Sequence, residues 1–250
     1  MKTVWLSANK LGLELLKEAI KVKGFDLNAV ITLDQTAATI MYDGVPAKSW
    51  QNFGVKVHQV SEINKEKALL KELAPDLVVM CGWRQVVDGE VLKIPPRGVI
   101  GFHPTLLPFG RGPAPIINSI LTGVRESGLT MFYPGTGLDD GDIIAQEKFK
   151  IGEVDDAATV YKKVIRAGKK IIRQYLPLII AGQASRTPQD GREAVVFKKP
   201  KLADNRIDLE KESLNDIYAK IKALSKPYKG AYLEKDGKKL IIWQAELLTT

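Results

Sequence analysis

Short apolar runs alternate with helical patterns through the first part of the chain, and this alternation limits the folds open to it. The apolar, β-branched runs predict strands at Thr3–Ser7, Leu27–Leu33, Val55–Val60, Asp76–Met80 and Gly98–His103. Helical patterns lie between these runs, for example over Ser61–Leu73. Strands that alternate with helices form a parallel sheet with right-handed crossovers and helices on both faces. We therefore predict an α/β fold with a doubly wound, mostly parallel sheet.

The second half of the chain adds a long helix and then a smaller C-terminal part. Apolar residues recur on one face from Asp155 to Ile180, which predicts one continuous helix. The following sequence is polar, basic and rich in turn-forming residues. The spacing of Ser213 and Asp216 fits a capping box, and Asp236-Gly237 fits the turn of a β-hairpin. We therefore predict an α/β domain at 1–182, a linker with one short strand at 183–212, and a small helix-plus-hairpin α+β appendage at 213–250.

The composition excludes several classes of site. With one cysteine, Cys81, the chain has no internal disulfide and no CxxC zinc pattern. With two histidines, His58 and His103, a histidine-rich metal site is excluded too, so we predict no bound metal. The first residues form neither a signal peptide nor a membrane span, so we expect a soluble, cytoplasmic protein that does not bind membranes. The net charge of +8 and the pI near 9.3 favour anionic partners.

The stretch VIGFHPTLLPFGRGPAPI places His103 at the end of a predicted strand, directly before a loop rich in proline and glycine. An imidazole can transfer protons near neutral pH, and it needs a carboxylate or a carbonyl to orient it. The stretch YPGTGLDDGDII supplies acids, and its glycines let the backbone approach a ligand. Asp139 beside His103 would form a proton-handling pair. The same residues also fit a rigid strand exit and an ordinary acidic turn, and their spacing leaves these interpretations open.

Other catalytic and phosphate-binding motifs are missing from the sequence. It has no GxSxG nucleophile motif, no P-loop and no GxGxxG after the first predicted strand. This argues against a serine hydrolase, against NTP hydrolysis and against nicotinamide binding by the usual motif. The early stretch LSANKLG offers backbone amides and Lys10 to a phosphate, although this pattern is not specific.

Two loop sequences and their spacing match the pattern of a known family. GFHPTLLPFGRGPAPI matches an HPSLLP-like loop followed by an RGxxP element, and SGLTMFYPGTGLDDGDII contains the LDxG acidic loop. Together they resemble the folate-dependent formyltransferases, a superfamily that includes methionyl-tRNA formyltransferase, glycinamide ribonucleotide transformylase and the sugar N-formyltransferases. PDLVVMCGWRQVVDGEVLKIP is similar to the family's folate-binding loop and the strand before it. Residues 207–246 look like the start of the C-terminal region shared by the tRNA and sugar enzymes.

The resemblance implies formyl transfer from 10-formyltetrahydrofolate to a primary amine. His103 and Asp139 would then be the catalytic residues. Protonated His103 would stabilise the oxyanion of a tetrahedral intermediate, and Asp139 would orient the imidazole and help to pass a proton from the amine to the departing folate nitrogen. The residues implied to bind the folate are Trp83, Gln85, Val87, Gly135, Thr136, Gly137, Leu138 and Asp139.

Gly101 departs from the family pattern. The family usually has an asparagine two residues before the histidine, where its amide helps to hold the formyl oxygen. Side chains two apart on a strand share a face, and glycine contributes none. Removing an oxyanion donor typically lowers turnover by about 100- to 1000-fold. Three interpretations follow: another group or a water replaces the amide, the substrate does not need it, or the chain is a non-catalytic homologue that binds folate or a nucleotide sugar.

The C-terminal part bears on the identity of the acceptor. The tRNA enzyme carries a full C-terminal β-barrel, whereas this sequence stops after one predicted hairpin. We therefore expect a small, anionic amine substrate, a nucleotide-linked amino sugar, in preference to tRNA. A methionyl-tRNA formyltransferase-like enzyme with a truncated C-terminal domain is the alternative. The hairpin also leaves an edge strand at which a second copy of the chain could pair as a homodimer. The candidate acceptor-binding residues are Asn9, Lys10, Arg111 and Gly112.

Overall fold

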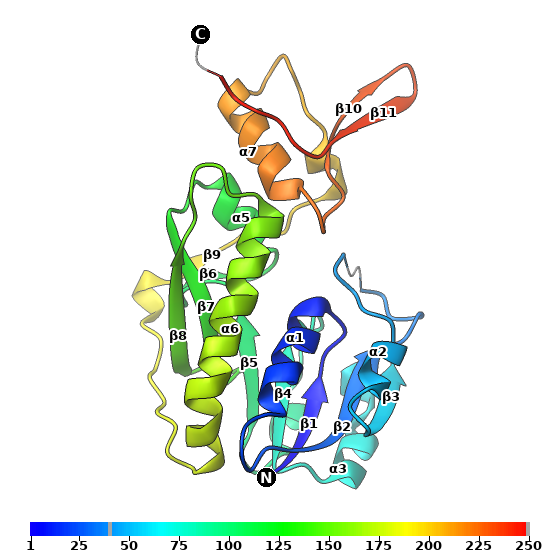
Figure 1. Cartoon of the computed structure of the whole chain (residues 1–250), viewed down its shortest axis with the longest axis vertical. Coiled ribbons are helices and arrows are strands. Elements are labelled where there is room, and N and C mark those ends of the chain that lie inside the picture. The colour runs from blue at the N-terminus through cyan, green and yellow to red at the C-terminus, as the bar shows by residue number, and fades with distance from the viewer. Residues whose placement is uncertain (40–41, 249–250) are drawn as a thin grey trace.

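A seven-stranded sheet forms the centre of the structure, a computed structural model that describes residues 1–39 and 42–248 (Figure 1). The strand order is β3-β2-β1-β4-β5-β7-β8. The strands are β1 (Lys2–Leu6), β2 (Asp26–Leu33), β3 (Lys56–Val60), β4 (Leu77–Cys81), β5 (Val99–His103), β7 (Glu126–Phe132) and β8 (Ile143–Lys150). The strands β1 to β5 are parallel, and β7 runs antiparallel to both of its neighbours. The predicted mostly parallel sheet is confirmed.

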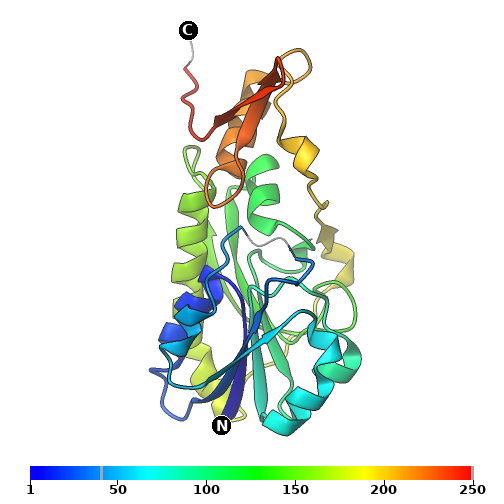
Figure 2. The ribbon, with the colours of Figure 1, turned by 90° about the vertical axis from the view of Figure 1, so that its right-hand side faces the viewer.

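Helices cover both faces of this sheet. They are α1 (Lys10–Ala19), α2 (Lys48–Gln51), α3 (Lys67–Leu73), α4 (Gly89–Leu92), α5 (Pro115–Leu121), α6 (Ala157–Ile180) and α7 (Leu214–Leu224). One hydrophobic core joins a face of the sheet to α1 and α6, and a second core joins the other face to α3 and α4. Figure 2 shows α6 on one side of the strands and α3 on the other. The prediction of a doubly wound arrangement is confirmed.

The order of the parallel strands changes direction between β1 and β4. From β1 the chain winds outward to β2 and β3, and it then returns through β4 to β5 on the other side. In sheets of this kind ligands bind beyond the carboxyl ends of the strands, near such a change of direction. The loops that follow β1, β4 and β5 therefore frame the region where a site is expected.

The segment after α6 runs back along the α/β unit before the chain reaches α7. Its strand β9 (Val195–Val196) pairs in parallel with β6 (Phe109–Arg111), a short strand in the loop after β5 that the sequence patterns did not predict. Two 3₁₀ helices, Gly191–Glu193 and Leu202–Asn205, flank β9. This packing brings the polar segment against one of the loops that matched the family pattern.

The C-terminal part consists of α7 and a hairpin, as the sequence predicts. Ser213 and Asp216 form the capping box of α7. Asp236-Gly237 joins β10 (Ala231–Lys235) to β11 (Lys238–Ile242). α7 contacts α5, and Figure 1 shows the hairpin at the end of the molecule where the parallel strands finish. Thr249 and Thr250, at the end of the predicted appendage, lie outside the described residues.

Within residues 1–39 and 42–248, no helix combines the length and the apolar character that crossing a membrane requires.

The predicted helix over Ser61–Leu73 is divided into a 3₁₀ helix (Ile63–Lys65) and α3. The predicted long helix is continuous. It begins after Asp156, whose side chain accepts a hydrogen bond from the backbone N–H of Thr159.

Close packing of α6 on α1 depends on Gly168. A Cβ built on this residue would lie 2.6 Å from Cδ2 of Leu15 and 3.0 Å from Cδ2 of Leu129, and both leucines are fully buried. The missing side chain therefore lets the longest helix approach both α1 and the sheet.

We expect Gly168→Val to destabilise the protein by about 1–3 kcal/mol, because extra methyl groups in a packed core force their neighbours to move. Thermal unfolding should show a melting temperature lower by several degrees. Gly191→Val is the control, since a Cβ there would meet no described atom within 4 Å. Equal melting temperatures for the two variants would contradict the packing argument.

Candidate active site

His103, the last residue of β5, is buried and has an acceptor at each ring nitrogen. Its Nε2 lies 2.8 Å from the carbonyl oxygen of Gly110, and its Nδ1 lies 3.5 Å from Oδ2 of Asp139. A carbonyl oxygen can only accept, so Nε2 carries a hydrogen. The contact between Nδ1 and the carboxyl group is attractive when a second proton lies between these two atoms. The geometry therefore favours an imidazolium beside a carboxylate, or an imidazole beside a protonated carboxyl group.

Asp139 reaches His103 from the loop 134–142 through an uncommon backbone conformation. Its φ is 47°, in the left-handed region, which costs most residues roughly 1–2 kcal/mol and which aspartate tolerates better than most. The atom Oδ2 of Asp139 also accepts a hydrogen bond of 2.9 Å from the backbone N–H of Gly112. One carboxylate oxygen thus faces both the imidazole and the loop that follows β5.

A buried chain of hydrogen bonds supports the loop after β5. Oγ1 of Thr130 donates to the carbonyl of Thr105 at 2.7 Å and accepts from the backbone N–H of Leu107 at 3.1 Å. Gln146 on β8 donates to the carbonyl of Leu107 and to Thr130. These bonds anchor the start of the loop whose later part carries the carbonyl facing His103.

Gly101 leaves no empty space where the family's asparagine would stand. A Cβ on Gly101 would lie 3.0 Å from Cε1 of Phe132 and 3.1 Å from Cγ of Pro134. The side chains of Phe132 and Pro134 therefore occupy the position beside His103 that a longer side chain would need. These two side chains pack directly against Gly101 and fill the space that an asparagine side chain would need.

The loop after β4 is held in place by one of its own predicted ligand-binding residues. Gln85 accepts a 3.0 Å hydrogen bond from the backbone N–H of Ile63 and donates to the carbonyl of Ser61 at 2.7 Å. Trp83 and Val87 pack partly against the core on the α3 side of the sheet. The indole Nε1 of Trp83 is buried and has no hydrogen-bond partner among the described residues. This loop therefore offers a ligand the half-buried apolar side chains of Trp83 and Val87, while the indole Nε1 itself is enclosed by the protein.

The acidic loop 134–142 lies between the loops that follow β4 and β5. Thr136 approaches the start of α4, and Leu138, which is 49% exposed, approaches the loop that follows β5. Side chains would not fit at Gly135 and Gly137, because a Cβ there would lie 2.5 Å and 2.0 Å from the carboxylate oxygens of Asp140. Of the predicted folate-binding residues in this loop, Asp139 contacts His103, and Thr136 and Leu138 face the loops on either side.

Asn9, at the start of α1, belongs to a buried network around Asp43. Its side chain donates to Oδ2 of Asp43 at 2.9 Å and accepts from the backbone N–H of Gly12 at 3.0 Å. The hydroxyl of Tyr161 donates to the same carboxylate and accepts from the backbone N–H of Leu11. Burial, together with the charge of Asp43, raises the pKa of Tyr161. These amides at the start of α1 are therefore bonded within the protein, which leaves them unavailable to a phosphate.

Arg84 forms the outer side of this network. Its guanidinium donates to Oδ1 of Asp43 at 3.1 Å and lies 5.6 Å from the ring centre of Tyr42. Lys10 is exposed at the start of α1. Two cationic side chains thus lie at the carboxyl ends of β1 and β4, where the strand order changes direction.

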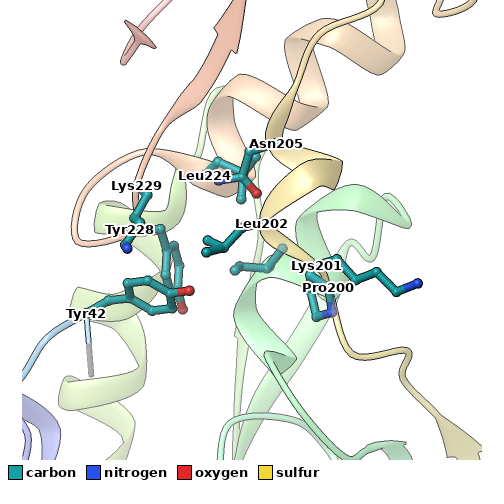
Figure 3. Close-up of a pocket in the computed structure, with 9 residues that line it drawn as sticks. Tyr42, Pro200, Lys201, Leu202, Asn205, Leu224, Tyr228 and Lys229 are labelled. Carbon is teal, nitrogen blue, oxygen red and sulfur yellow. The ribbon is translucent and has the colours of Figure 1, made fainter. Parts of the chain in front are cut away.

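A small pocket opens beside Tyr42, between the α/β unit and the C-terminal part (Figure 3). The rings of Tyr42 and Tyr228 meet edge to face, with their centres 5.6 Å apart. Nζ of Lys229 lies 5.9 Å from the centre of the Tyr42 ring. Figure 3 shows Lys201 extending away from these rings. The remaining lining residues are Ile117, Pro200, Leu202, Asn205 and Leu224. Sequence reasoning missed this pocket because four distant segments form it.

Arg111 contacts the segment that follows α6. Its Nε and one terminal nitrogen donate to Oε1 of Gln189 at 3.1 Å and 2.8 Å. The amide nitrogen of Gln189 donates to the carbonyls of Asp139 and Gly141. Sequence reasoning missed Gln189, because no motif marks it within a polar, turn-rich segment. The two bonds to Gln189 engage the guanidinium of Arg111, which the sequence predicts to bind the acceptor.

Solved structures share this fold along nearly the whole chain. A sugar N-formyltransferase from a Shewanella species has a TM-score of 0.78, with 21% identity over 100% of this chain and 99% of that one. An N-formyltransferase from Helicobacter canadensis, in complex with folinic acid and dTDP-3-aminofucose, has a TM-score of 0.71, with 22% identity over 96% of this chain and 86% of that one. The TM-scores establish a common α/β fold, and identities this low show no more than the fold.

Family models and curated relatives then define the family. Residues 2–176 match the model described as Formyl transferase, and residues 199–250 match the one described as Formyl transferase, C-terminal domain. The bifunctional polymyxin resistance protein ArnA of Wigglesworthia glossinidia brevipalpis is 31% identical over 99% of this chain and 38% of its own length. Methionyl-tRNA formyltransferase of Staphylococcus aureus is 34% identical over 79% of this chain and 64% of its own length. The chain belongs to the formyl transferase family, which confirms the resemblance, and it spans less than two thirds of these curated relatives.

We expect Gly101→Asn to lower stability by about 1–3 kcal/mol and to give no gain in turnover, because the new side chain must displace Phe132 or Pro134. The melting temperature should fall by several degrees. Gly152→Asn is the matched control, since the nearest described atom to a Cβ there is a side-chain oxygen 3.5 Å away. A stable Gly101→Asn variant with higher turnover would show that the site has room for the amide.

Proposed function

We propose that the chain transfers a formyl group from 10-formyltetrahydrofolate to the primary amine of a small, nucleotide-linked amino sugar. The observation that carries the proposal is the contact between buried His103 and the half-buried Asp139 of the glycine-rich loop, in a chain that belongs to the formyl transferase family. In this proposal His103 and Asp139 are the catalytic residues, the chain acts in the cytoplasm, and the division at 1–182, 183–212 and 213–250 separates catalytic domain, linker and C-terminal subdomain.

His103 acts through its charge in the proposed reaction. The amine nitrogen attacks the formyl carbon, and the carbonyl electron pair moves to the oxygen of a tetrahedral intermediate. An imidazolium stabilises that oxyanion through its positive charge, and a preorganised electrostatic contact at an oxyanion typically accounts for about 100- to 1000-fold in turnover. Since both ring nitrogens face acceptors in the structure, the imidazole offers the amine no lone pair.

Asp139 completes the proton transfer. As the intermediate collapses, the carbonyl re-forms and the bond between the formyl carbon and the folate nitrogen breaks. The amine loses one proton and the folate nitrogen gains one, so the proton count balances. In this proposal the carboxylate of Asp139, which faces Nδ1 of His103, relays that proton. Holding both substrates in one site lowers the remaining barrier.

The donor binds between the two loops that flank the catalytic pair. In this proposal Trp83 and Val87 supply apolar surface on one side, and Gly135 to Asp139 supply backbone groups on the other. The half-buried state of Trp83 and Val87 supports the assignment, because part of each apolar side chain stays accessible to a ligand. Gln85 contributes by fixing the loop that carries these residues.

The acceptor binds toward the pocket beside Tyr42. Two tyrosine rings with cations from Lys229 and Arg84 suit a nucleotide, whose base stacks on aromatic rings and whose phosphates attract positive charge. Lys10 lies at the same end of the sheet. Asn9, Arg111 and Gly112 shape the acceptor side through the internal contacts described above.

The exposed C-terminal residues Leu240, Ile241 and Trp243 are the proposed surface for a homodimer.

One experiment distinguishes the proposed function from two alternatives, the tRNA reaction and a non-catalytic binding role. The relatives include methionyl-tRNA formyltransferases, and Gly101 motivates a non-catalytic homologue that binds folate or a nucleotide sugar. The protein is incubated with 10-formyltetrahydrofolate and one amine at a time, either a nucleotide-linked amino sugar or methionyl-tRNA. Release of tetrahydrofolate with an amino sugar supports the proposal. Release with methionyl-tRNA alone indicates the tRNA reaction, and no release with any amine indicates the non-catalytic homologue.

We expect His103→Ala and Asp139→Asn each to lower kcat by at least about 100-fold, because they remove the positive charge and the carboxylate that pairs with it. Thermal unfolding checks that both variants fold. Asp142→Asn, a change in the same loop but outside the pair, should retain activity within about 3-fold of wild type. Full activity of either catalytic variant would exclude the assigned roles.

We expect Lys229→Met to raise the KM for the sugar nucleotide by about 3- to 10-fold and to leave kcat nearly unchanged, because a partly solvated cation contributes about 1 kcal/mol to binding a phosphate group. Lys235→Met on the hairpin is the matched control and should leave KM unchanged. Steady-state kinetics at low and high salt measure both. An unaltered KM for Lys229→Met would place the acceptor elsewhere.

A further inference from the structure

The segment that follows α6 crosses the loop that follows His103 and the loop that carries Asp139. Thr187 bridges to Ile143, directly after the acidic loop. Further along, β9 pairs with β6, and the backbone N–H of Phe197 donates to the carbonyl of Arg111 at 2.8 Å. The ring of Phe197 packs so closely on Gly110 that a Cβ there would lie 2.8 Å from it. This crossing segment, residues 187–198, thus touches the loop whose carbonyl faces His103.

Gln189 is the residue of the crossing segment that touches both loops at once. Its Oε1 accepts two hydrogen bonds from the guanidinium of Arg111, in the loop after β5. Its Nε2 donates to the carbonyl of Asp139 at 2.9 Å and to the carbonyl of Gly141 at 2.7 Å, in the acidic loop. The amide thus uses its acceptor end for one loop and its donor end for the other.

The carbonyl that Gln189 holds belongs to the residue with the strained backbone. Asp139 has φ 47°, and such conformations persist only where neighbouring contacts determine them. Its carboxylate must reach both His103 and the N–H of Gly112. Bonds to the carbonyls of residues 139 and 141 fix the turn of the loop on both sides of Asp140. The Gln189 amide therefore constrains the peptide that aims the carboxylate.

We propose that Gln189 is a positioning residue for formyl transfer, holding the acidic loop so that the Asp139 carboxylate faces His103. This inference rests on the proposed function. Gln189 acts through Asp139 and need not touch either substrate. A displacement of about 1 Å at a reacting group is enough to lower turnover by about 100-fold, so loss of this restraint should appear in kcat.

The two ends of the amide allow the positioning role to be separated from simple anchoring of the segment. Gln189→Glu keeps an acceptor for Arg111 and strengthens that contact through its charge. It also replaces the donor by an oxygen that faces two carbonyl oxygens, so the bonds to the acidic loop are lost. Gln189→Met has a similar volume and loses both sets of bonds. If Gln189 only anchors the segment, Gln189→Glu should behave like wild type.

Kinetics with the acceptor that the wild-type protein uses form the first measurement. We expect Gln189→Glu and Gln189→Met each to lower kcat by about 10- to 100-fold, with KM for either substrate within about 3-fold of wild type. Gln183→Glu, an exposed glutamine earlier in the same linker, is the matched control and should keep wild-type kinetics. Wild-type kcat for Gln189→Glu would overturn the proposal.

Amide hydrogen exchange forms the second measurement and does not depend on activity. In Gln189→Glu we expect faster exchange in the peptide 135–142 but not in 187–198, whereas Gln189→Met should speed exchange in both. Unchanged exchange in 135–142 for Gln189→Glu would overturn the positioning role. A wild-type protein that formylates no amine would instead overturn the proposed function, and the exchange pattern would still decide whether Gln189 holds the loop.

Discussion

The imidazole of His103 is buried between two acceptors, and much of the surrounding structure serves to keep both acceptors in place. The carbonyl of Gly110 meets Nε2 because the loop after β5 is tied to Thr130 and Gln146 beneath it. The carboxylate of Asp139 meets Nδ1 because the acidic loop accepts a left-handed residue. A ring held in this way suits a positive charge at a fixed position, which is the property that an oxyanion requires.

Segments outside the α/β unit contribute to this arrangement. The polar segment after α6 pairs with β6 and reaches the acidic loop through Gln189, while α7 and its neighbouring loop close one side of the Tyr42 pocket. A parallel sheet supplies the strand ends, but it does not determine how loops beyond those ends are held. Here the later part of the chain provides that support, so the framework and the appendage act together.

The start of α1 shows why strand-end chemistry cannot be inferred from topology alone. The amides of Leu11 and Gly12 lie where the strand order changes direction, a position that often binds phosphate. In this chain Tyr161 and Asn9 accept hydrogen bonds from them around the buried carboxylate of Asp43. Two cationic side chains lie at this end. Arg84 pairs with Asp43 and lies over the ring of Tyr42, and Lys10 is exposed.

The doubly wound sheet, the long helix, the terminal hairpin, and the turns after His103 and around Asp139 can all be predicted from the sequence alone. These features follow from local periodicity, capping and turn chemistry, which act over a few residues. Which groups surround the histidine depends on tertiary packing. The Gly110 carbonyl, Gln189, and Phe132 and Pro134 beside Gly101 come from segments whose proximity depends on packing between distant parts of the chain. Such contacts leave no periodic trace in the sequence, because each depends on where another segment has already folded.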